Sequence, residues 1–465
     1  ARRQREACRP RRVVAASSEQ VAAALGQRLG GTVRDLRRLS GGASRVTSSF
    51  DLETTDGGRR PLILQQERSA GGQAGRVHVE AALLGAAHEA GVPVPAVVAS
   101  GDGEGEGLKT DWLVVDRIEG ETIPRKLLRD DEWAHARAGL AGQCGEALAA
   151  IHTIDPDSIT GLARRDPLRN PLPILDALTE VRPALELGVR WLDVHRPPEG
   201  RRVTVHGDYR CGNFLVGPEG LRAVLDWELA HGGDPAEDIG WLCAPAWRFG
   251  GSGVVGGFGD LDQLLEAYVA AGGDTIAPDV VKWWQVYATV KWATICVMQA
   301  SAHLSGLTRS VELATIGRRV CESEWDLFVL LGIEPDGPAP EEMVSPSSVT
   351  SPFGRPTAAE LVEAVREYVE GTVMEQSQGG ARFEARIARN ALQTVERQLS
   401  LGPAIADAHQ ERLSRLGFAD DAGLAAEIRN GDFMDQWGVV GAALASSARD
   451  QLLVANPSYL PPAMA

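Results

Sequence analysis

Residues 203–226 read VTVHGDYRCGNFLVGPEGLRAVLD, and this stretch decides the fold. Two apolar runs flank the turn Gly217–Gly220, a pattern that predicts two short antiparallel strands. Asn213 precedes the first strand and Asp226 follows the second. Because the two strands of a hairpin run in opposite directions, this order brings the Asn213 amide and the Asp226 carboxylate to the same end.

Three side chains at this end of the hairpin have the chemistry of phosphoryl transfer. Asn213 and Asp226 offer the kind of oxygen ligands that Mg²⁺ takes together with nucleotide phosphates. Asp208, on the loop that enters the same end, is the candidate catalytic base. An Asp, four residues, an Asn and a second Asp after a hairpin follow the catalytic-loop order of protein kinases. The alternative is a loop whose Asp and Asn residues only cap turns.

The wider sequence resembles the aminoglycoside phosphotransferase and choline kinase superfamily. The resemblance rests on HGDYRCGN (206–213), LDWE (225–228) and GDPAED (233–238). More narrowly, VLDWELAHGGDPAEDIGWLC (224–243) resembles the branch whose domain is fused to some acyl-CoA dehydrogenases. The resemblance implies a small-molecule kinase with an α+β, protein-kinase-like fold of two lobes. The N-terminal lobe would be rich in strands and the C-terminal lobe mainly helical.

The same resemblance places His206 beside Asp208 among the candidate catalytic residues. We expect His206 to brace the catalytic loop through hydrogen bonds, with a direct chemical role as the alternative. Asp234 and Asp238 are expected to support the site, and Asp238 can cap the helix that follows. Glu228 is expected to lie behind the metal ligands, with contact to a second metal or a substrate amine as the alternative.

A glycine-rich hairpin is predicted near the N-terminus. The segment LSGGASRVTSSFDL (39–52) predicts a strand, a Gly-Gly turn and a second strand, and a third strand begins at Pro61. Gly41 and Gly42 let the backbone approach nucleotide phosphates closely, and Ser44 offers a hydroxyl. A Gly-Gly turn alone is common, so the assignment depends on its place before the catalytic hairpin.

One position departs from the pattern of the family. In kinase-like folds the third strand presents a cation to the α- and β-phosphates, whereas Gln65 stands there in this chain. A neutral amide can bond phosphate but cannot neutralise it. Either Arg68, another cation or metal compensates, or nucleotide affinity and turnover are weakened. By resemblance, Glu80 in the helix predicted at 77–90 is the carboxylate that normally orients the cation, and a solvated first-turn Glu is the alternative.

The nucleotide base is expected to meet a hinge after the strand predicted at 112–115. The hinge covers residues 116–120, and the backbone of Asp116 and Ile118 would contact the base. This contact is implied by the resemblance and has no independent signal in the sequence.

Composition limits the partners. The chain has 465 residues and a formal net charge of -16, which argues against nucleic acid and anionic membranes. Six cysteines show no CxxC pair or other ligand spacing, as in a cytoplasmic protein with reduced thiols. The apolar stretch 280–304 contains Lys282 and Lys291, so we interpret it as a buried helix and not as a membrane span.

A composition break separates a C-terminal module from the rest. Residues 335–356 are rich in proline and predict a linker, and helical patterns follow at 357–373, 381–399, 404–416, 422–428 and 437–454. This bundle resembles a helical domain of unknown function sometimes attached to the same branch. It lacks clustered His or Cys and paired carboxylates, which favours substrate gating, a protein partner or self-association. The predicted organisation is a disordered basic arm (1–18), an N-lobe (19–120), a helical C-lobe with the catalytic hairpin (121–334), the linker (335–356) and the bundle (357–465).

These features predict a Mg²⁺-dependent phosphotransferase that moves the γ-phosphate of ATP, or alternatively GTP, to a hydroxyl of a small molecule. The relation to acyl-CoA dehydrogenase fusions makes a hydroxyacyl-CoA or related metabolite a candidate acceptor. The rival is a pseudokinase scaffold that engages a partner through its C-terminal bundle. Gln65 favours the rival, whereas Asp208, Asn213 and Asp226 oppose it. A hydrolase using Asp208 and Asp226 lacks an assigned nucleophile.

Overall fold

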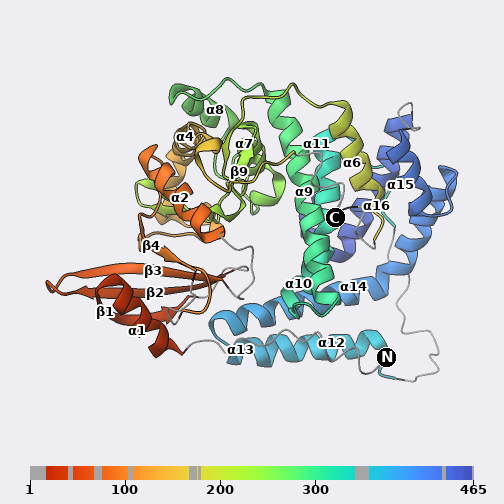
Figure 1. The fold of residues 1–465 in the computed structure, drawn as a ribbon. Coiled ribbons are helices and arrows are strands. Elements are labelled where there is room, and N and C mark those ends of the chain that lie inside the picture. The colour runs from red at the N-terminus through yellow and green to blue at the C-terminus, as the bar shows by residue number, and fades with distance from the viewer. Residues whose placement is uncertain are drawn as a thin grey trace, which may run out of the picture. The chain divides into compact units, whose positions relative to one another are not determined.

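A computed structural model gives the arrangement of the chain (Figure 1). The described chain divides into two compact units, each assembled from several segments. The first contains the described residues up to Arg164 together with 200–238 and 250–275, and the second contains those in 165–199, 239–249 and from 276 onward. The structure describes residues 17–39, 45–67, 76–102, 108–166, 175, 180–340, 355–431 and 436–462.

An antiparallel sheet of five described strands begins the first unit, in the order β1-β2-β3-β5-β4. Helix α1 (Ser18–Leu29) packs against it, and a core cluster joins Leu25 of α1 to Phe50, Leu62 and Trp112 of the sheet. A capping box at Ser17 begins α1, and Gly30 ends it in the left-handed region. The strands are β1 (Gly31–Arg38), β2 (Arg45–Thr54), β3 (Arg59–Glu67), β4 (Val97–Gly101) and β5 (Trp112–Asp116).

The first strand of the predicted glycine-rich hairpin lies earlier than expected. The prediction began it at Leu39, but β1 ends at Arg38 because Gly30 terminates α1 and the strand begins at once. The register of β2 and β3 pairs Arg45 with Glu67 and Thr47 with Gln65. This register brings the start of β2 beside the end of β3.

Helix α2 (Arg76–Glu89) confirms the helix predicted at 77–90. Its buried positions are Val77, Glu80, Leu83, Leu84 and Ala87, the spacing of one helix face. Glu80 therefore points inward with the apolar residues. It is 4% exposed, so the alternative of a solvated first-turn Glu is wrong.

The hairpin predicted around residues 217–220 forms. Its strands are β7 (Phe214–Gly217) and β8 (Gly220–Val224), and Phe214 pairs with Val224. A second two-stranded sheet pairs β6 (Val203–Val205) with β9 (His231–Gly233) on either side of the hairpin in sequence. Besides α1 and α2, the described α-helices of this unit are α3 (Pro124–Arg129), α4 (Ala134–Ile151) and α8 (Leu261–Ala270), and α7 (Ala236–Cys243) begins in it.

The second unit is helical. One core cluster joins Leu187 of α6 and Phe328 of α11 to Leu424 of α15 and Leu444 of α16, so the C-terminal helices share their core with earlier parts of the chain. The helices are α6 (Pro183–Val194), α9 (Pro278–Leu304), α10 (Val311–Ile316), α11 (Val320–Leu331), α12 (Ala358–Tyr368), α13 (Met374–Gln376), α14 (Gly379–Arg415), α15 (Asp421–Asn430) and α16 (Trp437–Ala455).

Two sequence expectations for this unit have clear outcomes. The helix predicted at 280–304 is α9, and among the described helices none is both long and apolar enough to cross a membrane. The separate helices predicted at 381–399 and 404–416 are wrong, because α14 runs through Pro403 without a break. Proline removes one helical hydrogen bond, but packing of α14 against α12 and α16 favours the continuous helix.

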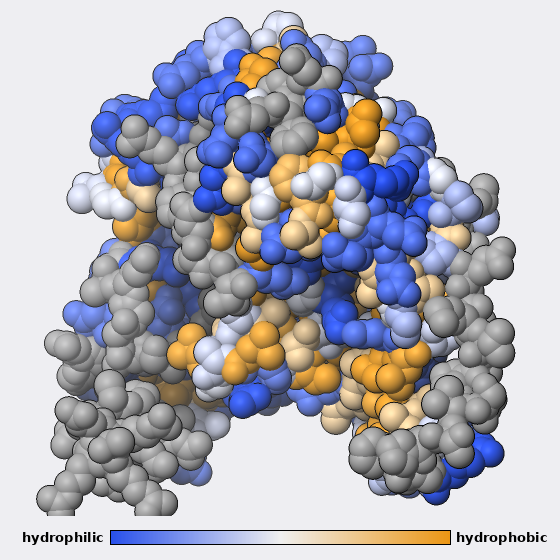
Figure 2. All heavy atoms as spheres, turned by 90° about the vertical axis from the view of Figure 1, so that its right-hand side faces the viewer, coloured by the Kyte–Doolittle hydropathy of each residue, from blue (hydrophilic) through white to orange (hydrophobic). Residues whose placement is uncertain are grey.

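Hydrophilic and hydrophobic residues are interspersed on the face seen in Figure 2. Several large apolar residues of α12 and α14 are exposed. Those of α12 recur at helical spacing and so lie on one face of that helix. The exposed apolar residues of α12 are Leu361, Val365 and Tyr368, and those of α14 are Phe383, Val395 and Leu399.

Candidate active site

Asp208 and Asn213 are joined by hydrogen bonds on the loop between β6 and β7. Asn213 Nδ2 donates to Asp208 Oδ2 at 2.7 Å and to the Asp208 carbonyl at 3.0 Å. The other Asp208 oxygen accepts from Arg210 Nε at 2.9 Å. Because the Asn213 nitrogen is used in this way, its Oδ1 is the atom left for a metal. The Asp208 carboxylate is held in one orientation by both neighbours.

Asp226 lies where negative charge is concentrated. It follows β8 in the left-handed region, with φ 65°, a conformation that costs a non-glycine residue on the order of 1–3 kcal/mol. Partial burial, with the carboxylates of Glu228, Asp208 and Glu80, raises the pKa of Asp226 to about 7. Crowded carboxylates and backbone strain of this kind are typical of a cation-binding site.

The donors present at this end of the hairpin fit a magnesium ion. Leu225 N donates to Asn213 O at 2.8 Å, which ties the residue before Asp226 to Asn213. Asn213 and Asp226 would supply two hard oxygen ligands, as Mg²⁺ prefers. Among the residues that the structure describes, no group of three or more His, Cys, Asp or Glu side chains could hold a metal by itself. Nucleotide phosphates and water would therefore complete the shell.

His206 connects the two halves of the site and is fully buried. Its Nδ1 accepts from the Asp208 backbone N–H at 3.3 Å, and its Nε2 lies 3.0 Å from the Leu225 carbonyl. Burial lowers the pKa of His206, so a neutral ring with the proton on Nε2 satisfies both contacts. This geometry favours the bracing role over direct chemistry.

Asp238 fixes the backbone before Asp208. Its carboxylate accepts from the backbone N–H groups of His206, at 2.7 Å, and Gly207, at 2.9 Å. His152 Nε2 lies 3.4 Å from the same carboxylate. Gly207 has φ 79°, and a Cβ there would lie 2.5 Å from the Leu229 carbonyl oxygen. The turn into the catalytic loop therefore requires glycine.

A buried arginine lies beside the position that lacks the usual cation. Arg45, the first residue of β2, donates from Nη1 to Glu80 and from Nε to Glu67 at 3.1 Å. Its Nη1 also lies 3.5 Å from Gln65 Oε1. Burial opposes the charge, but Glu80, Glu67 and Glu228 outweigh it and raise the pKa of Arg45. The cation expected on β3 is thus present on the neighbouring strand.

One nitrogen of Arg45 remains available. The Arg45 side chain is 7% exposed, and its Nη2 is buried without a hydrogen-bond partner in the described part of the chain. A buried donor without a partner is costly. Sequence reasoning missed Arg45, since only the strand register brings it beside Gln65 and opposite Glu80. Its one signal was a charged residue three positions after Gly42.

Arg76 is a second cation at the site. From the first position of α2 it donates to the Glu228 carbonyl at 2.9 Å, and its Nη2 lies 3.7 Å from Glu228 Oε2. Glu228 therefore faces Arg76 as well as Asp226.

The remaining predicted nucleotide contacts lie partly outside the described residues, which exclude Gly41, Gly42, Ser44 and Arg68. At the hinge, the Asp116 N–H donates to Ala96 O at 3.0 Å, and its carboxylate bonds Arg60. The backbone of Ile118 forms no hydrogen bond within the described segments. Of the two hinge residues, Ile118 is the one whose backbone stays available to a ligand.

Comparison with known families agrees with this geometry. Residues 35–284 match the model of the phosphotransferase enzyme family. Residues 375–459 match a domain of unknown function, DUF6285.

Two curated relatives are similar to about a third of this chain. Mouse acyl-CoA dehydrogenase family member 10 is 27% identical over 158 residues, which cover 31% of this chain and 15% of that protein. Chicken acyl-CoA dehydrogenase family member 11 is 28% identical over 178 residues, which cover 35% of this chain and 22% of that protein. The matched part spans less than a quarter of either relative.

A solved structure assigned to the aminoglycoside phosphotransferases, from Ralstonia eutropha JMP134, has a similar fold. Its TM-score is 0.54 at 20% identity, and the match covers 68% of this chain and 98% of that one. The similarity confirms the predicted α+β, kinase-like fold followed by additional C-terminal helices.

Proposed function

The chain belongs to the phosphotransferase enzyme family, and on that premise we propose that it transfers the γ-phosphate of ATP to a hydroxyl of a small molecule. In this proposal Asp208 is the catalytic base, Asn213 and Asp226 hold Mg²⁺, and Arg45 binds nucleotide phosphate. GTP is the alternative donor.

The observation that carries the proposal is the buried Arg45–Glu80 ion pair. A phosphotransferase needs a fixed positive charge near the nucleotide phosphates, and Gln65 cannot supply it. Arg45 has the charge, the orienting carboxylate and an unused Nη2 donor. Charge-assisted hydrogen bonds from arginine to phosphate are among the strongest in proteins. This arrangement removes the main argument for a pseudokinase.

The proposed chemistry rests mostly on positioning. Asp208 is oriented by Asn213 and Arg210, so one carboxylate oxygen can accept the proton of an approaching hydroxyl as its oxygen attacks the γ-phosphorus. Bound Mg²⁺ would neutralise charge on the phosphates. His206 and Asp238 hold the loop that carries Asp208, which fixes its distance from the ligands Asn213 and Asp226.

For the acceptor we propose a hydroxyl on an acyl thioester. The relatives from mouse and chicken are named as acyl-CoA dehydrogenase family members, and a kinase related to such proteins suits a hydroxylated acyl-CoA. Their names support this class and do not define the acceptor.

The test incubates the purified protein with Mg²⁺-ATP and a panel of hydroxyacyl-CoA, amino sugar and amino alcohol compounds. Mass spectrometry should detect an acceptor about 80 Da heavier, the mass of one transferred phosphoryl group, together with ADP. Absence of any product with ATP and GTP, together with no thermal stabilisation by either nucleotide, would favour the scaffold alternative. Asp226→Ala should abolish turnover, and Arg34→Ala, an exposed arginine on β1, is the control.

A further inference from the structure

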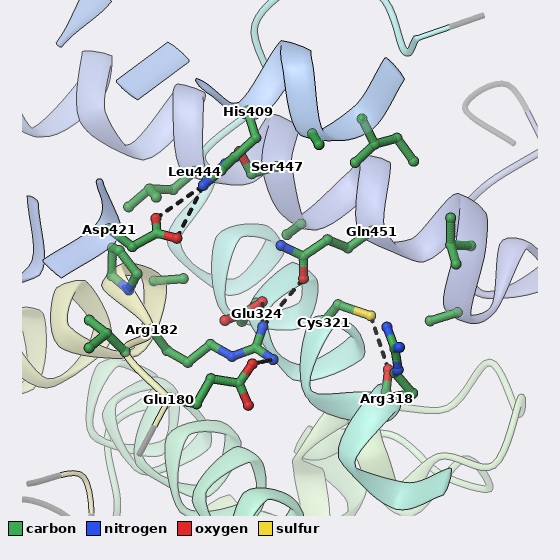
Figure 3. A pocket seen from close by; sticks show the side chains of 18 of the residues that line it. Glu180, Arg182, Arg318, Cys321, Glu324, His409, Asp421, Leu444, Ser447 and Gln451 are labelled. Carbon is green, nitrogen blue, oxygen red and sulfur yellow. Dashed lines mark hydrogen bonds and ion pairs between the residues drawn. The ribbon is translucent and has the colours of Figure 1, made fainter. Parts of the chain in front are cut away.

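A cavity of about 450 Å³ lies within the second unit, and its lining contains none of the residues assigned to phosphotransfer. Its walls come from α11, α14 and α16, from the start of α6 and from the chain just before it (Figure 3). Helix α6 belongs to the segment that matches the phosphotransferase family, and α14 and α16 belong to the segment that matches DUF6285. Cavities of this size hold small organic molecules.

The charged groups that line the cavity are three carboxylates, two arginines and one histidine. Glu180, Glu324 and Asp421 line it together with Arg182 and His409. The charges of Glu180, Asp421, Arg182 and His409 all interact with the Glu324 carboxylate. Arg318 also lines the cavity but is exposed, and it donates to Gln398 at 2.8 Å. Of the two arginines, Arg182 is mostly buried, at 17% exposed, as is Glu324 among the carboxylates.

Glu324 is the most deeply buried of these groups. Its side chain is 5% exposed, and within the described segments its carboxylate accepts no hydrogen bond. Its one close charge contact is Arg182 Nη1 at 3.5 Å, longer than a hydrogen bond to a carboxylate. A buried carboxylate without hydrogen bonds is costly, so this group is poised for a donor that the described chain does not supply.

Arg182 cannot satisfy Glu324 alone because its other contacts hold it elsewhere. Its Nη1 donates to Gln451 Oε1 at 3.3 Å, and its Nη2 donates to Glu180. His409 is also occupied, since its Nδ1 lies 3.0 Å from Ser447 Oγ and its Nε2 lies 3.1 Å from Asp421 Oδ1. Arg182 Nε is buried without a hydrogen-bond partner in the described chain, so Arg182 reaches Glu324 only through the 3.5 Å ion pair of Nη1.

We propose that this cavity binds a small organic ammonium ion, with its nitrogen at Glu324 and its carbon chain along the apolar wall. An ammonium group has three donors in a compact charge, which suits an enclosed carboxylate with unfilled acceptor sites. Ile405, Leu444 and Val454 supply apolar surface for methylene groups. Glu180 and Asp421, which are more exposed, lie where a second ammonium of a diamine can reach.

Such a ligand contacts helices of both matched segments at once, so it binds the folded unit and not the unfolded chain. This site is independent of the proposed phosphotransfer. The test is therefore a binding measurement that does not depend on turnover.

Thermal unfolding and calorimetry are measured with 1,5-diaminopentane and spermidine, with 1,5-pentanediol and glutarate as the neutral and anionic comparisons at equal ionic strength. The amines should raise Tm in a concentration-dependent manner, and the diol and glutarate should not. Glu324→Gln should weaken amine binding by at least about tenfold. Glu312→Gln, an exposed carboxylate outside the cavity, is the matched control.

A second variant covers the case in which Glu324→Gln does not fold. Ala406 lines the cavity and is exposed, so Ala406→Trp can obstruct the cavity without disturbing the core. It too should weaken amine binding. Unchanged Tm with either amine, equal stabilisation by the diol, or equal loss of binding in Glu312→Gln would overturn the proposal. Without ligand, the cavity variants should keep the cooperative thermal unfolding of the parent protein, and a folded variant that binds the amines as tightly as the parent would count against the site.

Discussion

Arg45 of β2 donates from Nη1 to the Glu80 carboxylate of α2, and both side chains are more than nine-tenths buried. Removing one partner of a buried pair leaves the other charge uncompensated, which costs about 3–5 kcal/mol. The pair therefore fixes a cation at the place where Gln65 offers none. Within the described residues Arg45 Nη2 has no hydrogen-bond partner, so it can donate to a phosphate.

Glu80→Gln should weaken Mg²⁺-ATP binding by about tenfold, because the amide no longer orients Arg45 through a charged hydrogen bond. Isothermal titration calorimetry measures the change. Glu53→Gln is the matched control, since Glu53 pairs with Arg34 at the surface at 2.9 Å. Equal affinities for the two variants would contradict the orienting role.

Asp208→Asn should lower kcat by about 10²–10⁴-fold, the usual contribution of a general base. The amide keeps an oxygen that can accept from Asn213, so the loop should hold its shape and Mg²⁺-ATP affinity should change little. Turnover and nucleotide binding are measured on the same preparation. A loss of binding as large as the loss of kcat would assign Asp208 to nucleotide binding.

Gly207→Ala should be more destabilising than Gly250→Ala. Both glycines have positive φ, 79° and 84°, so both substitutions carry backbone strain of about 1–2 kcal/mol. Only Gly207 adds a clash, since its Cβ would lie 2.5 Å from Leu229 O, whereas nothing lies within 4 Å at Gly250. Chemical denaturation of both variants measures the difference, and equal free energies of unfolding would show that the clash relaxes.

The catalytic hairpin could be predicted because its geometry is local. The side chains that meet are determined by two adjacent strands, the Gly-Pro turn between them and three polar residues at fixed offsets. The structure brings Asp208, Asn213 and Asp226 together. Glu80 was singled out by the resemblance alone, and the structure places it on the buried face of α2.

Arg45 could not be predicted because its role depends on pairing between strands. A shift of one residue in the β2–β3 register would turn Arg45 to the other face. The continuous helix α14 was missed for a similar reason. Pro403 is a local signal to stop, and packing against neighbouring helices overrides it.

Asp326→Asn should flatten the pH dependence of stability. Burial is the main cause that raises the pKa of Asp326 to about 7, well above its value in an unfolded chain. The folded protein then holds more protons between about pH 4 and 7, so this group stabilises at low pH and the contribution is lost as pH rises through 7. Tyr459 donates to Asp326 at 2.7 Å and can also donate to an amide oxygen.

Thermal unfolding of the parent protein and the Asp326→Asn variant from pH 5 to 8 checks this sign. The Tm of the parent should fall relative to the variant as pH increases. A parent that gains stability relative to the variant over this range would show that Asp326 is ionised at lower pH in the folded protein.

The central claim is tested by measuring the affinity for Mg²⁺-ATP of two variants, Arg45→Ala and the double variant Arg45→Ala/Gln65→Arg. Arg45 Nη1 lies 3.5 Å from Gln65 Oε1, so an arginine at position 65 can place its charge in the same region. We predict that Arg45→Ala weakens binding by about 10–100-fold, that Gln65→Arg restores most of it, and that Arg34→Ala changes nothing. Binding by Arg45→Ala within threefold of the parent protein would contradict the account.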